Sequence, residues 1–300
     1  MTEKKRAIAL GFFDGIHIGH GALLNKTKER AEEIGGVASV LSFDVHPDTL
    51  VFGREVPLIN SAVSREDIIR RCYGIEDVIF FHFNKDVMHM PWQTFAESII
   101  SDLNIGWIVV GHDFCFGDKG EGTAQKLKNY CESNGLGCDI IQAVKLDDRI
   151  VSSTYIRKLI ADGEMEQAAR YLGHPHTISD TVRSGYHLGT KMGMPTINMM
   201  IPDGVIVPRY GVYAAKVYLG DGTEHIAVTN VGVRPTVSDG NRVNVESHLL
   251  NFSGDVYGLE ARVELFCFQR PERKFADSDE LFAQIRQDAK NALDYFEMKK

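Results

Sequence analysis

The sequence predicts two domains, an α/β domain with a doubly wound parallel sheet and then an all-β domain. The second domain is expected to be a small antiparallel β-barrel with a terminal helix. Three observations predict this arrangement. Short apolar runs alternate with helical patterns over residues 1–173. Strand-like runs separated by Gly and Pro turns follow from residue 177. An amphipathic helical pattern then closes the chain. We therefore place the domains at residues 1–173 and 177–300.

The individual elements of both domains follow from the hydrophobic periodicity. Strands of the first domain are expected at 7–10, 36–43, 77–81, 105–110 and 139–144. Its helices are expected at 22–34, 64–73, 92–103, 123–134, 155–162 and 165–171. Ser64 is expected to cap the second helix and Pro91 to be the first residue of the third. Strands of the second domain are expected at 178–182, 212–219, 224–231, 243–249 and 261–268, before a helix at 278–296 with Ser278 as its cap.

Composition limits the classes of function that are open to this chain. Of its 300 residues, 44% are hydrophobic and 25% are charged, as in soluble globular proteins. The net charge of −8 disfavours a nucleic-acid partner. The chain has neither a targeting peptide nor an apolar run of spanning length, so we expect a cytoplasmic protein without a membrane partner. Five cysteines without CxxC spacing favour reduced thiols. The sequence leaves the oligomeric state open.

A glycine-rich stretch, GFFDGIHIGH, lies between the first expected strand and the first helix. His17 and His20 therefore lie at or next to a helix N-terminus, where free backbone N–H groups and the helix dipole favour phosphate. Gly11, Gly15 and Gly19 let the backbone approach a ligand closely. Imidazole N–H groups can stabilise charge on a phosphoryl oxygen. The stretch predicts a phosphate site, although neither common phosphate-loop motif is present.

HIGH resembles the HxGH signature of nucleotidylyltransferases, and GFFDGIHIGH is similar to the opening of bacterial bifunctional riboflavin kinase/FAD synthetases. FDVHP at 43–47, GHDFCFG at 111–117 and VSSTYIR at 151–157 resemble further segments of that family. One residue of the Ser152–Ser153–Thr154 run is also expected to cap the helix at 155–162. The resemblance implies that His17, His20 and Arg157 stabilise the transition state of adenylyl transfer. It implies nucleotide contacts from Gly11, Phe12, Asp14, Gly15, Gly19, Asp113, Phe116, Ser152, Ser153 and Thr154.

The second half resembles the flavokinase domain of the same family in several separate strings. Glycines at every fourth position precede PTIN, as in the flavokinase loop GxxxGxxxGxPTAN. VESHLLNFSGDVYG, at 245–258, is similar to VExHLLDFxGDLYG. The resemblance implies that Glu246 is a general base and that Thr196 and Asn198 bind Mg²⁺, a cation that prefers oxygen ligands. It implies nucleotide contacts from Gly185, Gly189, Lys191, Gly193 and Tyr213, and flavin contacts from Arg234, Arg273 and Phe275.

The resemblance covers nearly the whole chain and implies two consecutive reactions on small molecules. The second domain would phosphorylate riboflavin with ATP to give FMN, and the first would adenylylate FMN with ATP to give FAD and pyrophosphate. Departures from the family pattern at Cys115, Gly120, Thr190 and Ile197 leave open an enzyme with only one activity. A flavin-binding regulator and a nucleotidylyltransferase for another phosphorylated alcohol are the further alternatives.

Overall fold

The structure is a computed structural model that describes residues 4–53, 55–183, 196–233, 243–254 and 256–299. The chain forms two compact units. The first comprises Met1–Pro57 and Arg65–Ser153, and the second comprises Leu58–Ser64 and Thr154–Lys300. The units therefore divide inside the helix α7 (Ser153–Asp162). The functional domain boundary at residues 173–177 stays a prediction.

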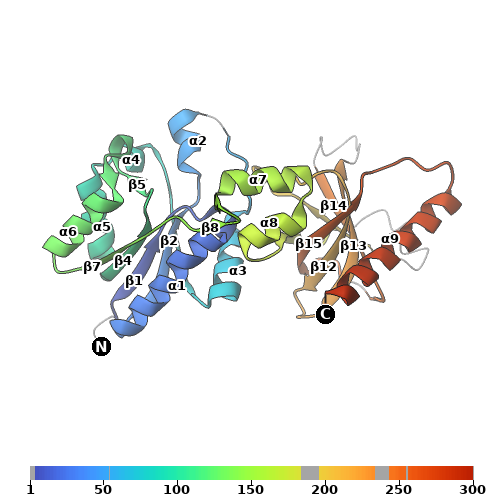
Figure 1. Cartoon of the computed structure of the whole chain (residues 1–300), viewed down its shortest axis with the longest axis horizontal. Coiled ribbons are helices and arrows are strands. Elements are labelled where there is room, and N and C mark those ends of the chain that lie inside the picture. The colour runs from blue at the N-terminus through green and yellow to red at the C-terminus, as the bar shows by residue number, and fades with distance from the viewer. Residues whose placement is uncertain (1–3, 54, 184–195, 234–242, 255, 300) are drawn as a thin grey trace. The chain divides into compact units, whose positions relative to one another are not determined.

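The first unit is built on five parallel strands in the order β3-β2-β1-β4-β7 (Figure 1). They are β1 (Arg6–Leu10), β2 (Val37–Phe43), β3 (Asp77–Phe81), β4 (Ile105–Gly111) and β7 (Gly137–Ile141). Every neighbouring pair in this sheet is parallel. The predicted doubly wound parallel sheet is confirmed. Because the strands are parallel, the loops that follow them leave from one edge, where α/β proteins bind ligands.

Helices cover both faces of this sheet and bury two separate core clusters. On one face, α1 (Ile18–Glu33) and α3 (Ala62–Tyr73) pack against side chains such as Ala9. On the other, α5 (Trp92–Asp102) and α6 (Ala124–Ser133) pack against Ile8 and Leu10. Successive residues of a strand point to opposite faces, so β1 must be apolar throughout when both faces are covered. This explains the uninterrupted run from Ala7 to Leu10.

Short elements complete the carboxyl edge of the first unit, and the periodicity did not predict them. They are α2 (Pro47–Phe52), α4 (Lys85–Met88), the 3-10 turns η1 (Asp14–Ile16) and η2 (Asp118–Gly120), and the strand pairs β5 (Cys115–Phe116) with β6 (Gly122–Thr123) and β8 (Lys145–Leu146) with β9 (Arg149–Ile150). Elements of two to six residues are too short to show a helical or alternating pattern.

The second unit is an antiparallel barrel preceded by α7 and α8 (Met165–Leu172). Its strands are β10 (His176–Thr181), β11 (Thr196–Met200), β12 (Gly211–Leu219), β13 (Glu224–Val233), β14 (Val243–Leu249) and β15 (Glu260–Arg270). Their order is β10-β15-β12-β13-β14-β11. A bridge between Arg183 and Asn198 joins the two ends of the sheet, with an N–O distance of 2.8 Å. The predicted barrel is confirmed, with β11 lying where the sequence indicated a loop.

The terminal helix α9 (Ser278–Met298) packs on the outer face of β12 and β13 (Figure 1). Ala292 and Phe296 meet Val212 and Ala214 there. The alternate residue Tyr213 has no exposed surface, because it points to the opposite face, the barrel interior. The expected amphipathic helix is therefore present and covers one side of the barrel.

Several helices begin at residues other than those predicted, because a different side chain satisfies the first backbone N–H groups. Ser64 lies inside α3, and its N–H donates to the hydroxyl of Ser61. Asp277 caps α9 by accepting from Glu280 N at 2.9 Å, so Ser278 is the first helical residue and not the cap. The His17 side chain likewise caps α1, which begins at Ile18. The helix α7 begins at Ser153, and Pro91 is the N-cap of α5 without a side-chain hydrogen bond.

Candidate active sites

The first candidate site is the turn between β1 and α1. His17 is the N-cap of α1, and its Nδ1 accepts the backbone N–H of His20 at 3.1 Å. An accepting Nδ1 carries no proton, so the neutral ring of His17 keeps its N–H at Nε2. The two imidazoles stack, with ring centroids 3.6 Å apart and planes 10° apart. The structure thus brings both predicted histidines together at a helix N-terminus.

The surroundings of His20 favour its neutral form. Burial, followed by the nearby His17 and Arg65, holds the pKa of His20 well below its usual value of 6.5. A neutral imidazole can donate one hydrogen bond to a phosphoryl oxygen without bringing a charge of its own. The Nδ1 atom of His20 is buried, and no residue in the described part of the chain hydrogen-bonds to it. A buried ring nitrogen without a hydrogen-bond partner is unusual and marks His20 as a candidate functional residue.

The glycines of this turn have steric and conformational reasons to be glycine. A Cβ on Gly19 would lie 3.0 Å from Cε1 of the His17 ring, closer than ordinary contact. Gly15 has a φ of 81°, in the left-handed region that glycine adopts at no cost. Phe13 and Ile16 also have positive φ, at 58° and 42°. Strained residues of this kind persist only where their surroundings hold them, and they cluster at functional sites.

Two hydroxyl groups hold the backbone of the turn. The carbonyl of Phe12 accepts a hydrogen bond from Ser42 Oγ at 2.8 Å. The carbonyl of Asp14 accepts one from Ser153 Oγ at 2.9 Å, and the Asp14 side chain is itself buried. Ser153 is the first residue of α7, so Ser152 directly precedes the helix, whereas Ser153 and Thr154 are not caps. Thr154 and Arg157 belong to the second unit, and their roles toward a nucleotide stay predictions.

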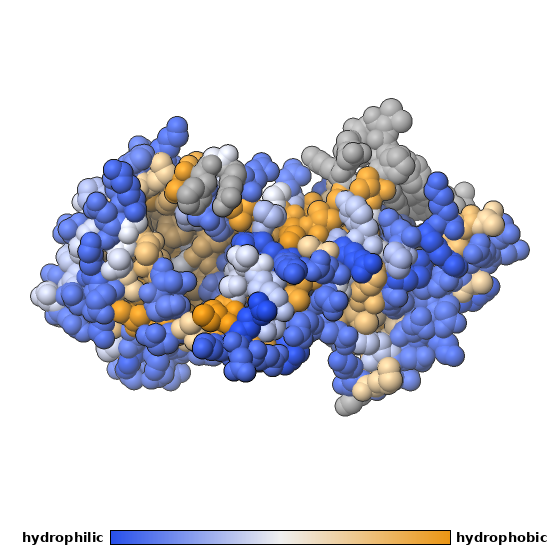
Figure 2. All heavy atoms as spheres, turned by 45° about the horizontal axis from the view of Figure 1, so that its top comes forward, coloured by the Kyte–Doolittle hydropathy of each residue, from blue (hydrophilic) through white to orange (hydrophobic). Residues whose placement is uncertain are grey.

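Asp113 and Phe116 follow the carboxyl end of β4, at the same edge as the histidine turn. The Asp113 carboxylate is exposed, whereas the Phe116 ring stacks on Phe114 with centroids 5.3 Å apart. Phe116 also packs against the core formed by α5 and α6. Figure 2 shows hydrophobic side chains gathered in a recess of the first unit. Cys115, one of the departures from the family pattern, is exposed.

Sequence reasoning assigned no specific role to two other side chains beside this turn. His46 caps α2, with Nδ1 accepting from Asp48 N at 3.1 Å, and its ring lies edge-on to Phe12 at 4.5 Å. The proline after His46 is the sequence signal that a helix begins there, because proline is frequent in the first turn of a helix. Arg65 is completely buried and hydrogen-bonds to the turn. No local pattern pointed to it.

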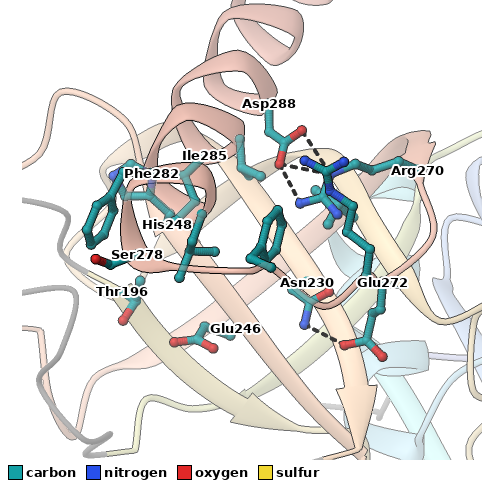
Figure 3. Close-up of a pocket in the computed structure, with 15 residues that line it drawn as sticks. Thr196, Asn230, Glu246, His248, Arg270, Glu272, Ser278, Phe282, Ile285 and Asp288 are labelled. Atoms are coloured by element: carbon teal, nitrogen blue, oxygen red, sulfur yellow. Dashed lines mark hydrogen bonds and ion pairs between the residues drawn. The ribbon is translucent and has the colours of Figure 1, made fainter.

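The second candidate site is a pocket of about 410 Å³ on the outer face of the barrel, beneath α9 (Figure 3). The strand register explains its composition, since directly paired residues share a face. Thr196 pairs with His248, and Glu246 pairs with both Asn198 and Asn230. The pocket is lined by Thr196, Val212, Val228, Asn230, Glu246, His248, Arg270, Glu272, Arg273, Phe275, Ser278, Leu281, Phe282, Ile285 and Asp288.

One end of this pocket offers oxygen ligands. Figure 3 shows Thr196 and Glu246 at the end opposite Arg270 and Asp288. Asn198 is nearly buried beside them, and its side-chain oxygen accepts from Asn244 Nδ2 at 3.4 Å. A hydroxyl, an amide oxygen and a carboxylate fit Mg²⁺, which takes few protein ligands and completes its shell with water and substrate phosphates. Among the described residues, no group of three or more His, Cys, Asp or Glu side chains could hold a metal ion.

The other end of the pocket is held by charged side chains. Arg270 Nη2 donates to Asp288 Oδ2 at 2.7 Å, which ties β15 to α9. Gln284 Nε2 donates to the other oxygen of Asp288 at 2.7 Å, and Gln284 Oε1 accepts from Arg273 Nη2 at 2.9 Å. The Arg273 guanidinium also lies 4.7 Å from the centre of the Phe275 ring. The structure therefore brings Arg273 and Phe275, both expected from sequence, to the pocket wall.

Three groups of sequence-predicted residues lie elsewhere. Tyr213 does not reach the pocket, because it is buried inside the barrel and its hydroxyl donates to the carbonyl of Arg209. Ile197 is also buried and lies on the face of β11 opposite Thr196 and Asn198, so this departure alters the core and not the pocket. Gly185, Gly189, Lys191, Gly193 and Arg234 lie outside the described residues.

Comparisons with known proteins match both units. A family model for FAD synthetase matches residues 1–155, and one for riboflavin kinase matches residues 172–296. A bifunctional riboflavin kinase/FMN adenylyltransferase of Listeria monocytogenes is 30% identical over 98% of this chain and 94% of its own. Those of Bacillus subtilis and Escherichia coli are each 33% identical over 98% of this chain and 93% of their own.

A solved structure also matches nearly the whole chain. It is described as a macrolide-efflux protein from Streptococcus pneumoniae, is 28% identical, and covers 97% of this chain and 94% of its own with a TM-score of 0.83. In the described part of the present chain, no helix is both long and apolar enough to span a membrane.

The parallel sheet with its histidine turn and the barrel with its carboxylate pocket are the two halves of an ATP-dependent transferase. The chain belongs to the family of bifunctional riboflavin kinases/FMN adenylyltransferases.

Proposed function

We propose that this chain makes FMN from riboflavin in its second unit and FAD from FMN in its first unit. This proposal rests on the observation that each unit has its own group of candidate catalytic side chains. His17 and His20 stack at the N-terminus of α1, and Glu246 lies in the pocket beneath α9. ATP, riboflavin and FMN are then substrates, and none of them is a bound prosthetic group.

In the kinase reaction, Glu246 takes the proton of the riboflavin 5′-hydroxyl as its oxygen attacks the γ-phosphorus of ATP. A new P–O bond forms, the bond to the bridging oxygen breaks, and ADP leaves. Phe275 and Phe282 give the pocket an apolar wall that suits a flat flavin ring. Thr196 and Asn198 would hold Mg²⁺, which neutralises charge on the phosphates when bound.

In the adenylylation reaction, a phosphate oxygen of FMN attacks the α-phosphorus of ATP, and pyrophosphate leaves. No covalent enzyme intermediate is required. His17 donates through Nε2–H, and neutral His20 donates through its own ring N–H, to oxygens whose negative charge grows in the transition state. The amino terminus of α1 adds backbone N–H groups and a favourable dipole. Arg157 and the Ser152–Thr154 segment would hold the triphosphate.

We further propose a cytoplasmic location and partners limited to small molecules. The net charge of −8 supports the absence of a nucleic-acid partner. The alternatives of a single activity or a flavin-binding regulator predict one product or none.

The experiment uses Glu246→Gln, which removes the general base and leaves the first unit intact. We expect it to lower FMN formation from riboflavin by about 100-fold or more, since general bases typically contribute 10²–10⁴-fold. FAD formation from supplied FMN should not change. Glu224→Gln is the matched control, because Glu224 also lies on the barrel but pairs with Lys216 outside the pocket. Loss of both activities in folded Glu246→Gln protein would contradict the two-site assignment.

A further inference from the structure

Arg65, on α3, is the largest side chain in the described part of the chain with no exposed surface. Arginine is almost never fully buried without a partner. Its hydrogen-bond partners among the described residues are neutral oxygens and not carboxylates. Nη1 donates to the Phe12 carbonyl at 2.6 Å and to Ser42 Oγ at 2.8 Å, and Nη2 donates to the Phe43 carbonyl at 2.9 Å.

The guanidinium is also enclosed by aromatic rings. Its central carbon lies 4.3 Å from the centre of the Phe12 ring and 5.2 Å from that of Phe80. Burial lowers the pKa of Arg65 to about 10, while Asp14 and Asp44 act in the opposite direction, so the group is charged at neutral pH. Burying a charge without a salt-bridge partner costs stability that an apolar side chain would not cost. Stability alone therefore does not account for an arginine here.

The three bonds of Arg65 join the turn after β1 to the end of β2 at the carboxyl edge of the sheet. The Phe12 carbonyl directly precedes the left-handed Phe13, at the start of the strained turn that ends at His17. Ser42 and Phe43 are the last residues of β2. Ser42 Oγ donates to the same Phe12 carbonyl, so the arginine, the hydroxyl and the carbonyl form a closed triangle. These hydrogen bonds therefore fix the position of the start of α1 relative to the end of β2.

We propose that Arg65 is a positioning residue of the adenylyl-transfer site. Its buried guanidinium holds the Phe12 carbonyl against the end of β2 by hydrogen bonds. These bonds fix the positions of the His17 and His20 rings. The inference rests on the proposed FMN adenylyltransferase activity. Arg65 acts through the turn, because Nη1 and Nη2 both donate to protein oxygens, while Nε is buried without a hydrogen-bond partner among the described residues.

The test compares Arg65→Met, Arg65→Lys and Ser42→Ala with Arg30→Met as the matched control. Arg30 is also a bonded arginine of the first unit, but it pairs with Asp139 at 2.6 Å near the far end of α1. Each sample is assayed for FAD formed from FMN and, as an internal check of folding, for FMN formed from riboflavin. Ring resonances of His17 and His20 are followed by NMR, which reports the turn independently of activity.

We expect Arg65→Met to lower the kcat of adenylylation by about 100-fold, the effect of a misplacement near 1 Å, with a small change in the KM for ATP. The His17 and His20 resonances should shift. Arg65→Lys should recover about a tenth of the wild-type kcat, because lysine restores the charge but not the planar fork. Ser42→Ala should lower kcat less than Arg65→Met. Arg30→Met should leave kcat and both resonances unchanged, and kinase activity should persist throughout.

Wild-type adenylylation kinetics and unmoved histidine resonances in folded Arg65→Met would overturn the inference, as would a purely KM effect. If Arg65→Met fails to fold, the inference is tested by Arg65→Lys and Ser42→Ala. An unchanged kcat of adenylylation in both variants would also overturn the inference. Wild-type protein that makes no FAD would instead refute the proposed function. In that case the NMR comparison still decides whether Arg65 sets the histidine geometry.

Discussion

His17, in the histidine turn, combines an observed structural role with a proposed chemical one. The Nδ1 atom of His17 caps α1, and the Nδ1 atom of His46 caps α2 in the same way. The motif in the sequence predicted His17 and His20 as site residues. It did not predict the capping role, because Ser, Thr, Asp and Asn are the usual caps and because Gly19 and Ile18 weaken the helical pattern at its start.

Substitution of His17 should separate these two roles. His17→Asn keeps a side-chain oxygen that can accept the His20 N–H, so stability should be nearly unchanged while adenylylation falls about 100-fold or more. His17→Ala should lose the same activity and about 1 kcal/mol of unfolding free energy as well. Urea unfolding and FAD formation measure the two effects. Equal stability of both variants would show that capping by His17 contributes nothing.

At the scale of elements, long segments with a clear period were predictable, whereas short or paired segments were not. The run from Ala7 to Leu10 predicted β1 because both of its faces are buried. The strand β11 was missed, since Ile197 and Met199 are recognisable as an inward-facing pair only when their barrel partners are known. The Arg65 contacts span at least 22 residues of sequence, so no local pattern could indicate them.

The strand β10 makes the second unit sensitive to acid. His176, its first residue, has no exposed surface, and neither ring nitrogen has a hydrogen-bond partner among the described residues. Burial, with a smaller effect of His174, lowers the pKa of His176 to about 3. The unfolded chain binds a proton below about pH 6.5, but the folded chain does not. Stability is therefore complete above that pH and declines as the pH falls toward 3.

This linkage predicts a loss of about 2 kcal/mol of unfolding free energy from His176 between pH 7 and pH 5. His176→Leu should remove that loss, and His225→Leu, at the half-exposed start of β13, should not. Urea unfolding at the two pH values, followed through kinase activity and circular dichroism, measures the difference. An equally steep decline in His176→Leu protein would contradict the assignment.

At the scale of the whole molecule, one chain carries two sites that need not contact each other. Family motifs predicted the core of both candidate sites from sequence, namely His17 and His20 in one unit and Glu246 in the other. The full pocket wall was not predictable, because Asn230, Arg270 and Asp288 meet only through the barrel register and the docking of α9. FMN is the product of one unit and the substrate of the other, so it can pass through solution.

The most direct test of this account is chromatography of the products that an equimolar mixture of His17→Asn and Glu246→Gln makes from riboflavin, ATP and Mg²⁺. Alone, His17→Asn should stop at FMN, and Glu246→Gln should leave riboflavin unchanged. Together they should form FAD, because the FMN released by one variant is adenylylated by the other. If the mixture forms no FAD although the wild type does, or if either substitution removes both activities from folded protein, two independent sites in one chain are contradicted.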